Sequence, residues 1–231
     1  MILRNDDIAR LRSIDLFSHV SDAHFLKLAR AASLRRVPPH TVLFREGERP
    51  RVLYTLIDGA VELFSQHHDR RCTIAVLRSV KPCVLTSIMQ DRNPMSARTL
   101  ESSELLLVPA RLIHEMIETD PGFTAAASHE LAEDCREVTE DFKTERLTTA
   151  IERLASWMLR ADAEAGGTGH FALPYDKRTL ASVLGMAPAN LSRNLAALAP
   201  AGVVVHGRRV TLSDRAALAA RSGLGVAPAG E

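Results

Sequence analysis

The 231-residue sequence has few cysteines, few aromatic residues and no long apolar run. Its three cysteines, Cys72, Cys83 and Cys135, are widely spaced without a CxxC or CxxH pair, which argues against a disulfide framework or a structural zinc site. No apolar stretch approaches the roughly 18 to 20 residues of a membrane span. The charged start, residues 1–12, lacks the apolar region of a signal peptide. We therefore expect a cytoplasmic protein with reduced thiols, no metal site and no membrane partner.

The sequence also has almost no net charge, because 29 basic and 28 acidic side chains leave +1. Such a value argues at first against nucleic-acid binding, since proteins that bind a polyanion usually carry a basic surplus. The charge is unevenly distributed, however. Residues 1–145 hold 19 basic and 22 acidic side chains, whereas residues 146–231 hold 10 basic and 6 acidic, a net of +4. Nucleic acid therefore stays a candidate partner of the C-terminal part.

The first half of the chain predicts short helices followed by many short strands. Apolar residues recur at helical spacing within residues 5–32. Between residues 34 and 109, aliphatic and β-branched stretches alternate with turn signals such as Pro38-Pro39 and Asp58-Gly59. Short strands spaced by roughly 8 to 12 residues are typical of an all-β sandwich or roll.

A long helix is predicted after Asp120-Pro121, since residues 123–143 contain neither glycine nor proline. Its apolar residues form a narrow seam, in steps of four and three, that consists of Ala127, Leu131, Cys135, Val138 and Phe142. A stripe of two positions per heptad is typical of a coiled coil, whereas packing on a globular core usually needs a wider apolar face. We expect this seam to be a dimer interface, with packing inside one chain as the alternative.

Residues 175–198 follow the pattern of a helix-turn-helix. Asp176 can cap a short first helix, and Gly185 can end it, because glycine enters the left-handed conformation without strain. Pro188 fits the first position of a second helix. In a helix-turn-helix, this second helix enters the major groove of DNA and its N-terminal side chains reach the base edges.

Polar and basic side chains lie where such a motif contacts DNA. Arg193 on the second helix can pair bidentately with guanine, and the start of the first helix can contact phosphates. Residues 203–212 read as a hairpin wing with two arginines near its tip. The candidate DNA-binding residues are Lys177, Arg178, Thr179, Pro188, Ala189, Asn190, Ser192, Arg193, Asn194, Arg208 and Arg209. The alternative is an ordinary helical hairpin with a solvated face, but the wing, the local positive charge and the preceding seam favour DNA binding.

An enzyme is not expected, and we assign no catalytic residue. The sequence shows no Ser/His/Asp order, no paired-carboxylate spacing, no HExxH and no phosphate-binding glycine loop. Two non-enzymatic alternatives remain. One is a small-molecule-binding β-roll protein or an effector-independent regulator of the same fold, and the other is a dimerisation or adaptor protein whose helix-turn-helix is vestigial.

The order of these segments resembles the CRP/FNR family of bacterial transcription regulators. The matching pieces are LFREGE at 43–48, LIDGAVEL at 56–63, MSARTL at 95–100, Val108-Pro109, IERLASWML at 151–159 and the winged helix-turn-helix. The resemblance implies an α+β chain in which sensor state controls DNA binding by a homodimer, with a double-stranded operator and RNA polymerase as partners. It implies a cyclic-nucleotide-binding-like jelly roll (β-roll) at 1–120, a dimerisation helix at 121–145, a winged helix-turn-helix at 146–223 and a flexible tail at 224–231.

Family members that bind cyclic nucleotides carry a Gly-Glu pair and an Arg-Ser-Ala run, which hold ribose and phosphate. Here residues 84–89 stand where the Gly-Glu pair is expected, and Met95 stands where the phosphate-binding arginine is expected. Arg98 is close by, but a regular strand places it on the opposite face from Met95. Because the charge-assisted phosphate contact is missing, cyclic AMP binding is not expected. The resemblance places the effector pocket around Met89, Met95, Ser96 and Arg98.

The segments 95–100 and 175–193 look most like the nitric-oxide- or nitrite-responsive denitrification regulators of the family (NnrR/DNR type). This subgroup suggests haem as a cofactor, although none of the nine histidines sits in a motif that marks an axial ligand. An iron–sulfur cluster is not expected, because no cysteine precedes Cys72. Ser192 and Arg193 match the base-reading residues of related regulators, but Ala189 stands where a glutamate is expected. The operator sequence of those relatives therefore does not transfer to this chain.

Overall fold

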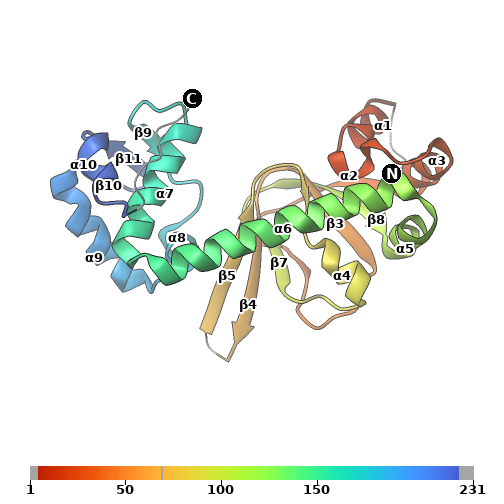
Figure 1. The fold of residues 1–231 in the computed structure, drawn as a ribbon, viewed down its shortest axis with the longest axis horizontal. Helices are drawn as coiled ribbons and strands as arrows, with labels where there is room; N and C mark the ends of the chain where they lie inside the picture. Colours follow the sequence, from red (N-terminus) through yellow and green to blue (C-terminus); the bar gives the residue numbers. More distant parts are fainter. Residues whose placement is uncertain (1–4, 69, 224–231) are drawn as a thin grey trace. The chain divides into compact units, whose positions relative to one another are not determined.

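The computed structural model describes residues 5–68 and 70–223 and divides into two compact units, residues 1–137 and 138–231 (Figure 1). The tail expected at 224–231 lies outside the described residues. The expected α+β architecture of a β-roll, a long helix and a winged helix-turn-helix is confirmed. Among the described residues, no helix combines the length and apolar composition needed to cross a bilayer.

The first unit is a roll of two four-stranded antiparallel sheets, with helices before and after the strands and one short helix between them. Its helices are α1 (Asn5–Arg12), α2 (Asp15–Ser18), α3 (Asp22–Ala31), α4 (Leu85–Gln90), α5 (Ala110–Thr119) and the first part of α6 (Pro121–Leu147). Its strands are β1 (Ser33–Val37), β2 (Val42–Phe44), β3 (Val52–Asp58), β4 (Val61–His67), β5 (Arg70–Leu77), β6 (Lys81–Pro82), β7 (Ser96–Thr99) and β8 (Ser103–Pro109). One sheet has the order β1-β8-β3-β6 and the other the order β2-β7-β4-β5.

Alternation along the strands builds two separate cores. Leu105 of β8 joins Leu56 and Ala97 in a cluster between the two sheets. Its neighbour Leu106 points to the other face of the sheet. There it belongs, with Phe17, to the core that the helices form with the first sheet. Successive side chains of a strand point to opposite faces, so a continuous apolar run such as that of β8 can serve two cores at once.

The α6 seam divides into a buried and an exposed part. Ala127 is 4% exposed and belongs to the helix-side core, and Leu131 packs against that core. Cys135 is exposed, and Val138 and Phe142 are 63% and 57% exposed. The prediction of Ala127 as a dimer contact is therefore wrong, because its side chain is already covered by its own chain. The alternative of packing inside one chain holds for Ala127 and Leu131, and the dimer interface stays a prediction for Cys135, Val138 and Phe142.

The second unit is a small α+β domain around a three-stranded sheet. It contains the end of α6, α7 (Ala150–Glu164), α8 (Lys177–Val183), α9 (Pro188–Leu198), the 3₁₀ turn η1 (Ala199–Ala201) and α10 (Arg215–Ala219). Its strands β9 (His170–Ala172), β10 (Val203–His206) and β11 (Arg209–Leu212) pair in the order β10-β11-β9. Its core includes Leu154, Met158, Leu180 and Leu198, each 0% exposed. Around this core, α9 packs against α7, α8 and β10.

Candidate nucleic-acid interface and sensor pocket

The helix-turn-helix forms as its sequence predicts. The carboxylate of Asp176 accepts the backbone N–H of Thr179 at 2.7 Å and caps α8. Gly185 takes φ +64°, a left-handed conformation that favours glycine, and lets the chain turn after α8. Pro188 occupies the first turn of α9, where its missing N–H is no loss. These three residues set the angle at which α9 leaves the turn.

The outward face of α9 carries most of the predicted base-reading residues. Pro188, Ala189, Asn190, Ser192 and Arg193 are exposed, while the leucines on the opposite face are buried or half-buried. The guanidinium of Arg193 donates to the side-chain oxygen of Asn190, one turn earlier. This contact directs the Arg193 side chain along the exposed surface of the helix.

Asn194 and Thr179 do not lie where the prediction places them. The amide nitrogen of Asn194 lies 3.7 Å from the sulfur of Met186, so this half-buried side chain is directed back toward the turn. Thr179 is 4% exposed. It is the third residue of α8 and faces the domain core, so its side chain is covered. Lys177 and Arg178 remain exposed at the start of α8, in position for phosphate contacts.

The predicted wing is the β10–β11 hairpin, in which His206 pairs with Arg209. Its two arginines differ. Nε and Nη2 of Arg208 both donate to the carbonyl of Leu173, at 3.0 and 2.7 Å, so this side chain fastens the wing to the segment after β9. Arg209 is exposed on the wing. Arg209 is therefore the better placed of the two for a phosphate.

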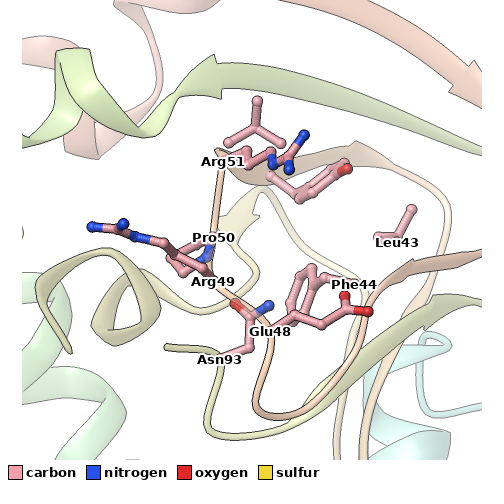
Figure 2. A pocket seen from close by; sticks show the side chains of 9 residues that line it. Leu43, Phe44, Glu48, Arg49, Pro50, Arg51 and Asn93 are labelled. Atoms are coloured by element: carbon pink, nitrogen blue, oxygen red, sulfur yellow. The ribbon is translucent and has the colours of Figure 1, made fainter. Parts of the chain in front are cut away.

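A cavity of about 530 Å³ opens in the first unit beside Phe44 (Figure 2). Phe44 forms an aromatic pair with Tyr54, and their ring centroids are 5.8 Å apart. Burial raises the pKa of Tyr54. Asn93 is 3% exposed, and its amide group donates to the carbonyl of Arg45, which fixes one wall. Arg49 extends away from the cavity (Figure 2), and its guanidinium pairs with the carboxylate of Asp91. The other lining residues are Leu43, Glu48, Pro50, Arg51 and Val52.

None of the four residues predicted for the effector pocket lines this cavity. Met89 is 51% exposed on α4, and Met95 packs against the core between the sheets. The hydroxyl of Ser96 accepts the backbone N–H of Glu46 at 3.0 Å. Arg98 points to the opposite face of the sheet from Ala97, as the alternation of β7 requires, and pairs with Glu62. The prediction that these four residues form one pocket is therefore wrong.

Glu62 is the centre of a buried polar cluster that the sequence reasoning missed. Its carboxylate is 2% exposed and accepts Nε of Arg98 at 2.6 Å, Nη2 of Arg71 at 2.7 Å and the hydroxyl of Thr73 at 2.7 Å. The guanidinium of Arg71 lies 3.6 Å from the ring centroid of Phe64. Glu62 and Arg98 are direct cross-strand partners. The opposite charges of two neighbouring strands were the signal that could have revealed this cluster.

Within residues 5–68 and 70–223, no group of three or more histidine, cysteine, aspartate or glutamate side chains is placed to hold a metal ion. No histidine, cysteine or methionine lines the cavity beside Phe44, so its residues do not fit an axially coordinated haem. Burial raises the pKa of Cys83 to about 12, which keeps this thiol protonated.

Two family models match the chain. A cyclic nucleotide-binding domain model matches residues 34–120, and a Crp-like helix-turn-helix domain model matches residues 152–221. These ranges contain the roll and the unit with α8 and α9, respectively. The search of curated proteins gives no match.

Several solved structures share the fold. FixK2 from Bradyrhizobium japonicum has a TM-score of 0.69 and 21% identity, and the match covers 81% of this chain and 95% of that one. CLP, the c-di-GMP responsive global regulator of Xanthomonas campestris, has a TM-score of 0.70 and 20% identity, with 82% and 96% covered. DNR from Pseudomonas aeruginosa has a TM-score of 0.51 and 20% identity, with 95% and 99% covered.

The two matched domains stand in the order sensor first and helix-turn-helix second, and α9 presents a polar face outside the second core. On these grounds the chain is a Crp-like DNA-binding transcription regulator with a cyclic-nucleotide-binding-like sensor domain.

Proposed function

We propose that this regulator is a homodimer that binds a pseudo-palindromic operator, with α9 of each subunit in the major groove. The main support for this proposal is the exposed face of α9, where Asn190, Ser192 and Arg193 project on the side opposite the buried leucines. The N-terminal residues of a recognition helix are those that reach base edges. Arg193 fits O6 and N7 of guanine. Because Ala189 carries no carboxylate, we expect no cytosine contact at that position.

The exposed part of the α6 seam supports the dimer. Cys135, Val138 and Phe142 follow one another at coiled-coil spacing and are open to solvent in the single chain. A two-fold axis beside this part of α6 would pair identical seams and bring two recognition helices to adjacent half-sites, about 34 Å apart. We propose RNA polymerase as the further partner of the DNA-bound dimer, in the cytoplasm.

We further propose nitric oxide or nitrite as the signal. The support is the likeness of segments 95–100 and 175–193 to the nitrogen-oxide regulators of the family. The cavity beside Phe44 and Tyr54 is the candidate place for an effector, because it joins an aromatic wall to a rim with Arg51. Haem takes no part in this proposal. A gel shift with and without a nitric-oxide donor or nitrite tests it. A change in DNA affinity is expected, and an unchanged affinity with both would contradict the signal.

The probe for DNA reading is a duplex that the protein selects from a random pool. Arg193→Ala is expected to weaken binding to this duplex by roughly 5- to 150-fold, because one bidentate base contact is worth about 1–3 kcal/mol. Binding to an unrelated duplex should change much less. Arg160→Ala is the matched control, since Arg160 is an exposed arginine of α7 outside the helix-turn-helix and wing. Equal losses for both variants on both duplexes would mean that Arg193 supplies charge only, and the proposal would fail.

A further inference from the structure

Arg153 of α7 lies between the ends of two other helices in the second unit. Its Nε donates to the carbonyl of Leu184 at 3.0 Å. Its Nη1 donates to the carbonyls of Thr148 at 2.7 Å and Glu145 at 3.4 Å. Leu184 is the C-cap of α8, the first helix of the helix-turn-helix. Glu145 lies in the last turn of α6, and Thr148 directly follows that helix. One side chain therefore joins the end of α6 to the turn of the helix-turn-helix.

A guanidinium is well suited to this position. The last carbonyls of a helix have no partner within the helix and carry partial negative charge. Arg153 satisfies such groups on two helices with charge-assisted hydrogen bonds in one plane. The ammonium group of a lysine is a compact point charge, so it cannot bind carbonyls of two helices in the same way. The contact is therefore specific for arginine and not only for positive charge.

Gly185 shows how closely this turn approaches α6. A Cβ built on Gly185 would lie 3.3 Å from Oε1 of Glu145 and 3.8 Å from Nη2 of Arg153. The turn thus lies against the last turn of α6, with Arg153 beside both. The recognition helix α9 begins only three residues after Gly185, at Pro188. Any movement of this turn relative to the end of α6 redirects α9.

We propose that Arg153 is a positioning residue that fixes the recognition helix on the end of the dimerisation helix. The inference rests on the proposed function, in which two copies of α6 pair. In such a dimer, the Arg153 contacts of both subunits would set the distance between the two recognition helices. Arg153 then determines which half-site spacing the protein accepts. It has no part in the reading of bases within one half-site.

The test compares four duplexes. The first is the duplex that wild type selects from a random pool. The second and third are this duplex with one base pair and with two base pairs inserted at its centre. The fourth is a duplex with a single half-site. Wild type should bind the inserted and single-site duplexes much more weakly than the selected one.

Arg153→Met keeps the apolar stem and removes the donors. It should bind the selected duplex at least roughly 10-fold more weakly, because loose linkage lowers the effective concentration of the second half-site contact. Its single-site binding should equal that of wild type, and its penalty for insertions should be largely lost.

Two controls separate positioning from folding. Trp157, the single tryptophan, is 9% exposed against Phe171 and Tyr175, so its fluorescence reports whether the second unit is folded. Arg160→Met removes the other arginine of α7 and should behave as wild type on all four duplexes. If Arg153→Met loses its native Trp157 emission, Arg153→Lys takes its place. This variant should show the same loss of spacing preference to a smaller degree.

The proposal is overturned if a folded Arg153 variant keeps the spacing preference of wild type within about twofold, since weaker linkage must relax that preference. It is also overturned if binding to the single half-site falls as much as binding to the selected duplex, because Arg153 would then act within one half-site. A wild-type protein that binds one and two half-sites equally would instead defeat the proposed dimeric function, whatever Arg153 does.

Discussion

Asp120 joins the start of α6 to the start of α3 through a buried carboxylate that is 1% exposed. One of its oxygens accepts the backbone N–H of Phe123 at 3.0 Å, and the other accepts the hydroxyl and the N–H of Ser21 at 2.6 and 3.0 Å. Burial opposes the charged form. The hydrogen bonds outweigh burial, however, and with His24 nearby they lower the pKa of Asp120 from 3.8 to about 2.

The low pKa of Asp120 predicts how stability depends on pH. A carboxyl with a lowered folded-state pKa stabilises the fold above its unfolded pKa of 3.8 and loses this contribution as the pH falls toward about 2. Asp120→Asn should therefore lower the unfolding free energy by roughly 2 kcal/mol at pH 6 and by little near pH 2. Urea unfolding at several pH values measures the difference.

Glu133→Gln is the control for this comparison, since Glu133 forms an exposed ion pair with Arg136 within α6. Such a pair is worth at most about 1 kcal/mol. The Glu133→Gln variant should therefore have nearly the same unfolding free energy as wild type at every pH. A constant difference between wild type and Asp120→Asn from pH 6 to pH 2 would contradict the role given to the Asp120 charge.

At the scale of elements, the apolar residues of α6 differ in burial along its length. Its first turns complete the core of the sensor unit through Phe123 and Ala127. Lys81 of β6 adds polar contacts in the next turns, with Nζ 2.8 Å from Asp134 and 2.9 Å from Glu137. Beyond these turns, Val138 and Phe142 are mostly exposed, and the guanidinium of Arg146 lies 5.1 Å from the ring centroid of Phe142. The apolar seam is therefore part of the sensor core only along its first turns.

Substitutions in α6 should therefore have different effects at its two ends. Val138→Glu and Phe142→Glu should convert the protein to monomers without lowering the thermal stability of the single chain, because both side chains are exposed in it. Leu131→Glu should also lower stability, since Leu131 packs on the sensor core. Sedimentation and thermal unfolding separate the two effects. Lys143→Glu, an exposed change outside the seam, should remain dimeric. Dimers of Phe142→Glu with wild-type affinity would rule out this interface.

The elements were largely predictable from the sequence because their signals are local. Asp176, Gly185 and Pro188 each act on the backbone next to them, and all three behave as their chemistry predicts. The cavity was not predictable, since Phe44, Tyr54 and Asn93 come from separate segments that meet only when the sheets close. The Arg153 contacts were also hidden, because backbone carbonyls leave no mark in the sequence.

At the scale of the whole molecule, the small net charge is the sum over a sensor unit and a DNA-binding unit that differ in charge. The net of +4 in residues 146–231 includes Lys177, Arg178, Arg193 and Arg209, which are exposed on the helix-turn-helix and the wing. A dimer doubles this surplus on one operator. Binding should weaken steeply with salt, because each neutralised phosphate releases counterions. The total charge therefore says little about which partner each unit binds.

In the proposed function, two chains bind one operator together. The mass of the complex formed at low salt with a duplex selected from a random pool tests this claim most directly. We expect one species with two chains per duplex, and monomers that bind only weakly when Phe142 is replaced by glutamate. A complex with one chain per duplex, or no duplex selected at all, would contradict the account.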